Sequence, residues 1–189
     1  MTFTRILLAT ALAIGISASA DTAAETMSGT KTITLSNPAG EKVRIGTIVF
    51  TDAGPQKTGF AITIAPEFGD YFLAMRPFRC LSGPQQRLCW FPANREAQVI
   101  TPTDLVPLEY ALMFLRTKPT DLHLNPFNGV YYKLSRSGDK LIGAVHDVDM
   151  DPFITPDAVP LARRVRPIRP QDLSEGDART HWLPVMTIE

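Results

Sequence analysis

Apolar and polar residues alternate over several stretches of this chain, and a period of two is typical of β-strands with one buried face. In the run KVRIGTIVFT, Val43, Ile45 and Val49 fall on the same face. Clusters of glycine, proline, asparagine and aspartate separate this run from its neighbours, as turns between strands do. The same alternation predicts further strands at residues 31–36, 60–64, 71–81 and 88–91.

The clearest hairpin signal lies in the second half of the chain. Residues 130–134 and 141–145 flank a loop in which Gly138 suits a left-handed turn position. In the strand expected over residues 71–81, Pro77 favours a sheet edge or a bulge, because proline has no N–H for the ladder. The 16 prolines of the chain are also spread widely, which disfavours long helices.

Residues 103–116 leave two alternatives open. Their leucines recur at helical spacing, whereas residues 108–114 also alternate as a strand does. Pro107 comes late for a helix start. The pattern therefore favours a short helix or turn near residues 103–107, followed by a strand.

These patterns predict a mostly β fold, an antiparallel sandwich or small barrel of about seven to nine short strands. Residues 151–180 lose the alternation and are rich in proline and arginine, so we expect an irregular strap there. The apolar residues at 181–188 are expected to dock on the core. Residues 31–189 would thus form a single β-rich domain.

The first twenty residues indicate export. Arg5 precedes an apolar run of signal-peptide length, and Ala18 and Ala20 supply the small residues that signal peptidase accepts. We therefore predict a cleaved signal peptide at residues 1–20, a flexible tail at residues 21–30, and a periplasmic or secreted protein. No cysteine lies near the cleavage site, so a lipoprotein signal is not indicated.

Charge and hydropathy exclude some partners. The leader holds one of the 19 basic residues and none of the 19 acidic ones, so the mature chain is close to neutral. A nucleic-acid-binding protein usually carries a large positive excess, and none is present. After the leader no apolar stretch reaches the roughly 18 residues of a membrane span. The expected partner is an envelope protein or a small ligand.

Cys80 and Cys89 are the two cysteines of the chain, and an oxidising compartment favours a disulfide between them. Gly83 and Pro84 signal a turn between the cysteines, so the bridge would staple a hairpin. Closing a ten-residue loop stabilises by about 2.5–3 kcal/mol in the chain-entropy model. Short strands, a disulfide and aromatic hairpins resemble the layout of small exported β-barrels, among them lipocalin-like and lysozyme-inhibitor-like proteins.

One acidic run has the spacing of a metal site. On an extended strand, Asp147, Asp149 and Asp151 project from one face and could bind Ca²⁺. A calcium loop would need glycine and glutamate at its sixth and twelfth positions, where this chain has proline and alanine. The alternative is a solvated strand end. A third hypothesis is an envelope hydrolase that uses His146 with the three aspartates.

Four arginines form the other candidate site. Arg163, Arg164, Arg166 and Arg169 lie between prolines and could hold an anionic ligand or a partner protein. The alternative is neutralisation by the acidic residues that flank them. An inhibitor or assembly factor could present either this strap or the Cys80–Cys89 loop.

Signatures of catalysis are missing from the sequence. It has no G-x-S-x-G, H-E-x-x-H, P-loop or dinucleotide-binding pattern, and His123, His146 and His181 lie far apart. We therefore expect a non-catalytic protein without a cofactor. The aromatic residues would line a ligand cavity if the sheet closes around one, and would otherwise fill the core.

Overall fold

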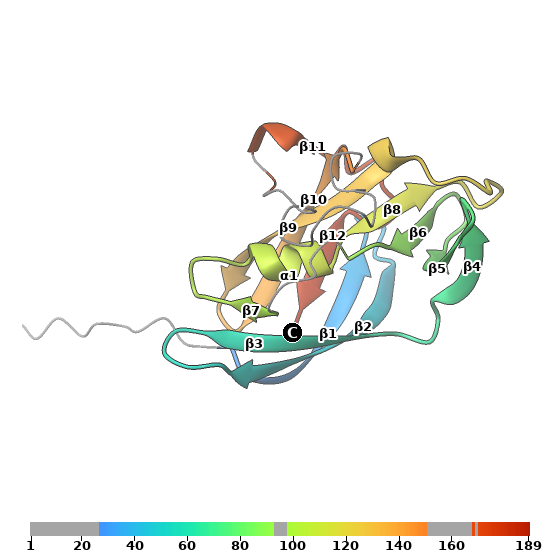
Figure 1. The fold of residues 1–189 in the computed structure, drawn as a ribbon. Helices are drawn as coiled ribbons and strands as arrows, with labels where there is room; N and C mark the ends of the chain where they lie inside the picture. Colours follow the sequence, from blue (N-terminus) through green and yellow to red (C-terminus); the bar gives the residue numbers. More distant parts are fainter. Residues whose placement is uncertain (1–26, 93–97, 151–167, 169) are drawn as a thin grey trace, which may run out of the picture.

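The computed structural model describes residues 27–92, 98–150, 168 and 170–189. These residues form twelve β-strands in one antiparallel sheet, with one α-helix and 3-10 turns (Figure 1). The predicted mostly antiparallel β fold is confirmed. The predicted signal peptide and the four arginines of the strap lie outside the described residues. No helix in the described ranges is long and apolar enough to cross a membrane.

The sheet has two arms, each an antiparallel meander. The first arm consists of β1 (Gly29–Ser36), β2 (Lys42–Asp52) and β3 (Thr58–Ile64), and β7 (Val99–Ile100) pairs with β3 at its outer edge. The second arm runs through β4 (Gly69–Leu73), β5 (Arg76–Ser82), β6 (Arg87–Trp90), β8 (Phe114–Thr117), β9 (Gly129–Ser137) and β10 (Lys140–Val148). Of the 3-10 turns, η1 (Pro126–Asn128) leads into β9.

The C-terminal strand β12 (Val185–Ile188) joins the two arms. Ile188 lies opposite Ile33 of β1 on one side and opposite Leu141 of β10 on the other. The short strand β11 (Leu173–Glu175) adds to the end of β10. The sheet is open, with β4 at one end of the strand order and β7 at the other.

Residues from both arms fill a common core. Phe114 is fully buried, with its ring centroid 6.3 Å from that of Phe68 and 6.2 Å from that of Tyr132. Ile33 and Met186 are also fully buried. These aromatic side chains therefore pack against one another in the core of the described part of the chain.

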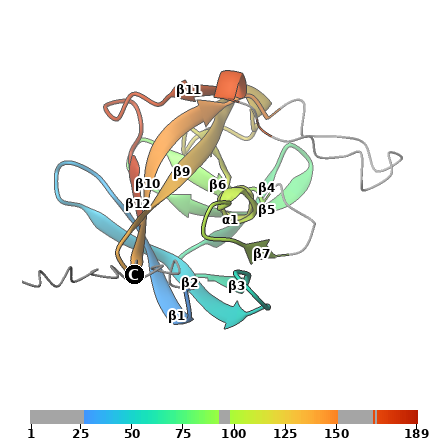
Figure 2. The same ribbon diagram turned by 90° about the vertical axis from the view of Figure 1, so that its left-hand side faces the viewer.

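The helix α1 (Val106–Ala111) corrects the preference for a strand after residue 107. The Asp104 carboxylate accepts a hydrogen bond from the Val106 N–H at 3.0 Å, and Pro107 occupies the first turn. Leu108 and Leu112 are fully buried, since helical spacing directs both toward the core. Both views place α1 between β3 and β9 (Figures 1 and 2). The strand begins at Phe114.

Other boundaries also differ from the sequence expectations. The strand β1 begins at Gly29, inside the expected tail, and Met27 is buried. Residues 71–81 were expected as one strand but form β4, a tight turn and β5. The number of strands exceeds the predicted nine for two reasons. One predicted strand divides into β4 and β5, and the short strands β7 and β11, of two and three residues, are not among the predicted ones. The C-terminal residues dock as predicted.

Candidate functional site

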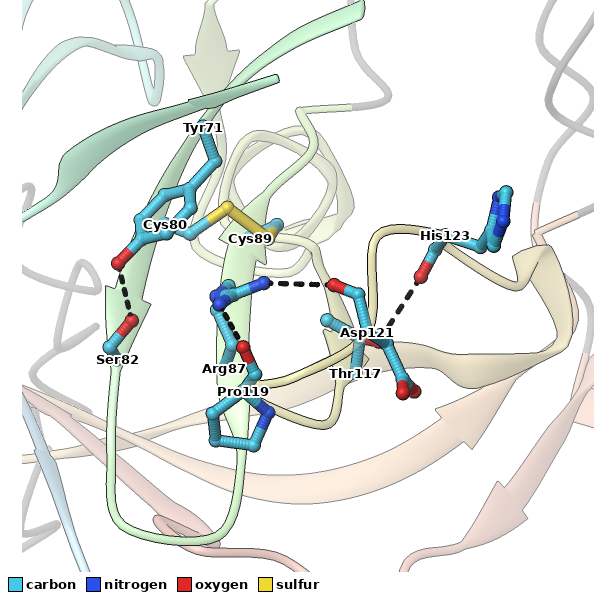
Figure 3. The surroundings of a disulfide bond; sticks show 9 residues. All are labelled: Tyr71, Cys80, Ser82, Arg87, Cys89, Thr117, Pro119, Asp121 and His123. Atoms are coloured by element: carbon cyan, nitrogen blue, oxygen red, sulfur yellow. Dashed lines mark hydrogen bonds between the residues drawn. A yellow bond between two sulfur atoms is a disulfide. The ribbon is translucent and has the colours of Figure 1, made fainter. Parts of the chain in front are cut away.

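The cysteine pair lies directly opposite on neighbouring strands. Cys80 of β5 pairs with Cys89 of β6, and their sulfur atoms are 2.11 Å apart, at disulfide-bonding distance (Figure 3). Both side chains are buried and pack with Leu73 at the end of β4. The bridge therefore staples the β5–β6 hairpin, as the sequence predicts, and stiffens the sheet next to its β4 edge.

Arg87 braces the same corner of the molecule (Figure 3). Its side chain is almost fully buried, and its guanidinium carbon lies 4.3 Å from the ring centroid of Tyr71 on β4. The guanidinium donates hydrogen bonds to the backbone oxygens of Pro119 and of Asp121, the latter at 3.2 Å. Arg87 thereby holds the loop after β8 against the outer face of three strands.

The loop between the cysteines is docked on the C-terminal segment. The Gln86 side chain donates to the Thr180 carbonyl and accepts a 3.0 Å hydrogen bond from the Trp182 N–H. Gly83 approaches the Trp182 ring so closely that a Cβ atom there would lie 2.5 Å from it. The C-terminal segment therefore covers one side of this loop, and presentation of the loop to a partner stays a prediction.

The β4–β5 turn exposes apolar side chains at the edge of the sheet. Met75 and Phe72 are 87% and 72% exposed, and Pro77, opposite Phe72, is also exposed. Ala74 and Met75 have φ angles of 47° and 62°, in the left-handed region that favours glycine. Such residues cost roughly 1–2 kcal/mol each. We refer to β4, β5 and this turn as the edge hairpin.

The edge hairpin has no turn signal in the sequence, because its two central turn positions hold no glycine, proline, asparagine or aspartate. The alternation simply continues through it. The one available signal was Pro77, which indicated an edge or a bulge. Pro77 lies in the part of β5 beyond the ladder with β6. In the described residues, therefore, no strand pairs with Pro77 on the side away from β4.

A second polar cluster forms around Asp147. Its Oδ1 atom lies 3.1 Å from Nη2 of Arg116 and 3.2 Å from Nε2 of His181. The His181 side chain is buried, and this burial lowers its pKa below the usual value, against the opposing effect of Asp147. A neutral imidazole is therefore favoured at neutral pH. Within the described residues no hydroxyl or thiol hydrogen-bonds to His181.

Each partner of the Arg116–Asp147 ion pair lines a different polar cleft. The cleft beside Arg116 has a volume of about 280 Å³ and is lined by Gln85, Gln86, Arg116, Thr117, Lys118, Asp121 and Asn128. The cleft beside Asp147 has a volume of about 270 Å³ and is lined by Phe127, Asp147, Val148, Asp149, Gln171, Asp172, Leu173 and Ser174.

The described members of the predicted hydrolase set, His146, Asp147 and Asp149, lie at or just after the end of β10. Strand alternation in β10 puts His146 and Asp147 on opposite faces, and His146 Nδ1 lies 3.1 Å from the Ala144 carbonyl. Asp149 follows the strand, whereas Asp151 lies outside the described residues. Among the residues that are described, no three histidine, cysteine or acidic side chains converge as a metal ion requires. Calcium binding stays a prediction.

Glu109 of α1 is the other buried charged group with a clear role. It accepts hydrogen bonds from the Tyr131 hydroxyl and, at 2.7 Å, from the Leu134 N–H. Burial raises the pKa of the Glu109 carboxyl, although both hydrogen bonds act in the opposite direction. The two hydrogen bonds anchor α1 to β9. Because the carboxyl group is buried, it does not form a site open to substrate.

No protein-family model, curated protein or solved structure matches this chain.

Proposed function

We propose that this chain is an exported, non-catalytic envelope protein that binds a protein partner through the edge hairpin. The observation that carries the proposal is the exposure of Phe72, Met75 and Pro77 together at the open end of the sheet. Exposed apolar groups on an unprotected edge strand favour association with another chain.

The backbone strain of the turn supports the same proposal. Ala74 and Met75 hold a conformation that glycine or asparagine would adopt at lower cost, yet the turn displays a methionine at its tip. Methionine is flexible and polarizable, and it is common on surfaces that bind other proteins. The Cys80–Cys89 pair and Arg87 keep the hairpin ordered, which reduces the entropy that a partner would have to remove.

Export is part of the proposal. A cysteine pair at bonding distance is compatible with an oxidising compartment. The predicted signal peptide supports the same location. Mass spectrometry of the protein from cell envelopes should give a mature chain that begins at Asp21 and is oxidised at both cysteines. A cytoplasmic, uncleaved and reduced protein would contradict export without bearing on the edge hairpin.

Site-specific photocrosslinking tests partner binding. A benzoylphenylalanine at Met75 should give a discrete crosslinked product in intact cells, and Phe72→Ser should remove most of it. The matched control is the same probe at Ile142, an exposed apolar residue of β10. Crosslinking products that are identical at the two positions, or that persist in Phe72→Ser, would overturn the proposal.

A further inference from the structure

The register of the edge hairpin determines where the backbone groups of β4 point. Phe72 lies opposite Pro77. In an antiparallel ladder, two opposite residues either exchange two hydrogen bonds or exchange none. Proline has no N–H to donate, so Phe72 and Pro77 form a pair without hydrogen bonds. The N–H and the C=O of Phe72 therefore point away from β5, toward the open edge.

The same geometry recurs two residues earlier. Bonded and non-bonded pairs alternate, so Asp70 and Arg79 are also a non-bonded pair. The backbone groups of Asp70 thus face the open edge as well. No strand, and no other backbone group in the described part of the chain, bonds to these edge-facing groups. The edge presents two donors and two acceptors in the register that an added strand requires.

The side chains on this edge define the chemistry of the added strand. Asp70 and Phe72 project from the same face, since they are two residues apart, and both are exposed. Arg79, opposite Asp70, donates instead to the carbonyls of Ala65 and Phe68, at 3.1 Å and 3.4 Å. Asp70 has no ion pair within the described residues. The edge therefore offers an apolar surface next to the negatively charged side chain of Asp70.

We propose that β4 binds an extended segment of the partner protein as an additional antiparallel strand. The segment carries an apolar residue opposite Phe72 and, two positions later, a lysine or arginine opposite Asp70. Main-chain hydrogen bonds supply affinity in this mode, and alternate side chains supply specificity. This inference rests on the proposed function and specifies how the partner is recognised.

Synthetic peptides test the backbone part of the inference. The probe is an acetylated, amidated heptapeptide of threonines with isoleucine at its third position and lysine at its fifth. Titration into the oxidised, full mature protein, followed by NMR, should shift the amide signals of Asp70 and Phe72 and slow their hydrogen exchange. N-methylation of the isoleucine should weaken binding about tenfold, because its N–H bonds to the Phe72 carbonyl.

The matched control is N-methylation of the intervening residue, whose N–H points away from β4. It should change the affinity less than about twofold. Equal losses from the two N-methylated peptides would overturn strand addition, because the register predicts that the intervening amide makes no contact with the edge.

A charge exchange tests the side-chain part. Asp70→Lys should weaken the lysine peptide about threefold to fivefold, and a peptide with glutamate in place of lysine should recover that loss. Absence of recovery would overturn the predicted basic position. If no peptide binds while Phe72→Ser still removes crosslinking at Met75, strand addition is wrong and the proposed function stands. If crosslinking at Met75 also fails, both are wrong.

Discussion

The guanidinium of Arg87 lies 4.3 Å from the ring centroid of Tyr71, across two strand spacings of the sheet. Tyr71 belongs to the edge strand β4, and its hydroxyl also bonds to Ser82 of β5 at 2.7 Å. The contact thus holds the outermost strand in place from one face, while the opposite face of that strand carries the exposed residues Asp70 and Phe72. The position of the edge hairpin therefore depends on Arg87, a buried residue that lies outside the exposed surface of that hairpin.

Arg87→Met should destabilise the protein by about 2–4 kcal/mol, since the carbonyls of Pro119 and Asp121 lose charge-assisted donors and the contact with Tyr71 disappears. Urea denaturation measures the change. The control is Arg44→Met, at an exposed position of β2, which should stay within about 0.5 kcal/mol of the native protein. Equal effects of the two substitutions would show that Arg87 does not brace the hairpin.

Replacement of both cysteines by alanine should lower the free energy of unfolding by about 2.5–3 kcal/mol, the chain-entropy value for a ten-residue loop. Treatment of the native protein with a reductant should give a similar loss, because reduction also removes the cross-link that restricts the unfolded chain. The reductant should leave the stability of the double-alanine variant unchanged. A change there would show that reduction acts elsewhere.

Acidification should destabilise the protein through His181. Burial lowers its folded-state pKa, so the unfolded chain takes up a proton first, near pH 6.5. The free energy of unfolding therefore falls as pH drops below about 6.5 and continues to fall until the folded pKa is reached. His181→Gln should show a shallower pH dependence than the native protein between about pH 7.5 and 5.

Glu109 should give the opposite pH dependence. Its folded-state pKa is raised, so the folded protein keeps a proton that the unfolded chain has lost. Its contribution to stability is complete below about pH 4.5 and declines as pH rises through the folded pKa. Glu109→Gln should therefore gain stability relative to the native protein as pH rises, measured by urea denaturation at several pH values. A constant difference between the two proteins would contradict burial of the charge.

Gly83→Ala should separate the hairpin loop from the C-terminal segment. The new Cβ would lie 2.5 Å from the Trp182 ring, so the ring must move and lose its 2.9 Å hydrogen bond to Glu41. We expect a loss of about 1–3 kcal/mol. In a Trp90→Phe background, Trp182 fluorescence should shift to the red. Gln85→Ala, at an exposed neighbouring position, should cause neither change.

Alternation and turn residues were sufficient to predict the fold class and several elements. The hairpin predicted at residues 130–134 and 141–145 corresponds to β9 and β10, and Gly138 has the expected left-handed φ of 63°. The pairing of Cys80 with Cys89 was predictable because a turn lies between them. These features depend on residues close together in the chain, and period and turn chemistry are written locally.

The edge hairpin and the Asp147 cluster depended on tertiary structure. Ala74 and Met75 give no turn signal, and their conformation is held by contacts such as the bond from the Ala74 N–H to the Leu122 carbonyl at 3.1 Å. Asp147 meets Arg116 and His181 because β8 and β10 flank β9 in the sheet and β10 lies beside the segment that leads into β12. The sequence by itself determined a mostly β chain with a stapled hairpin. Tertiary structure decided which strand remained at the edge, because strand order follows from how both arms bury their apolar faces in one core.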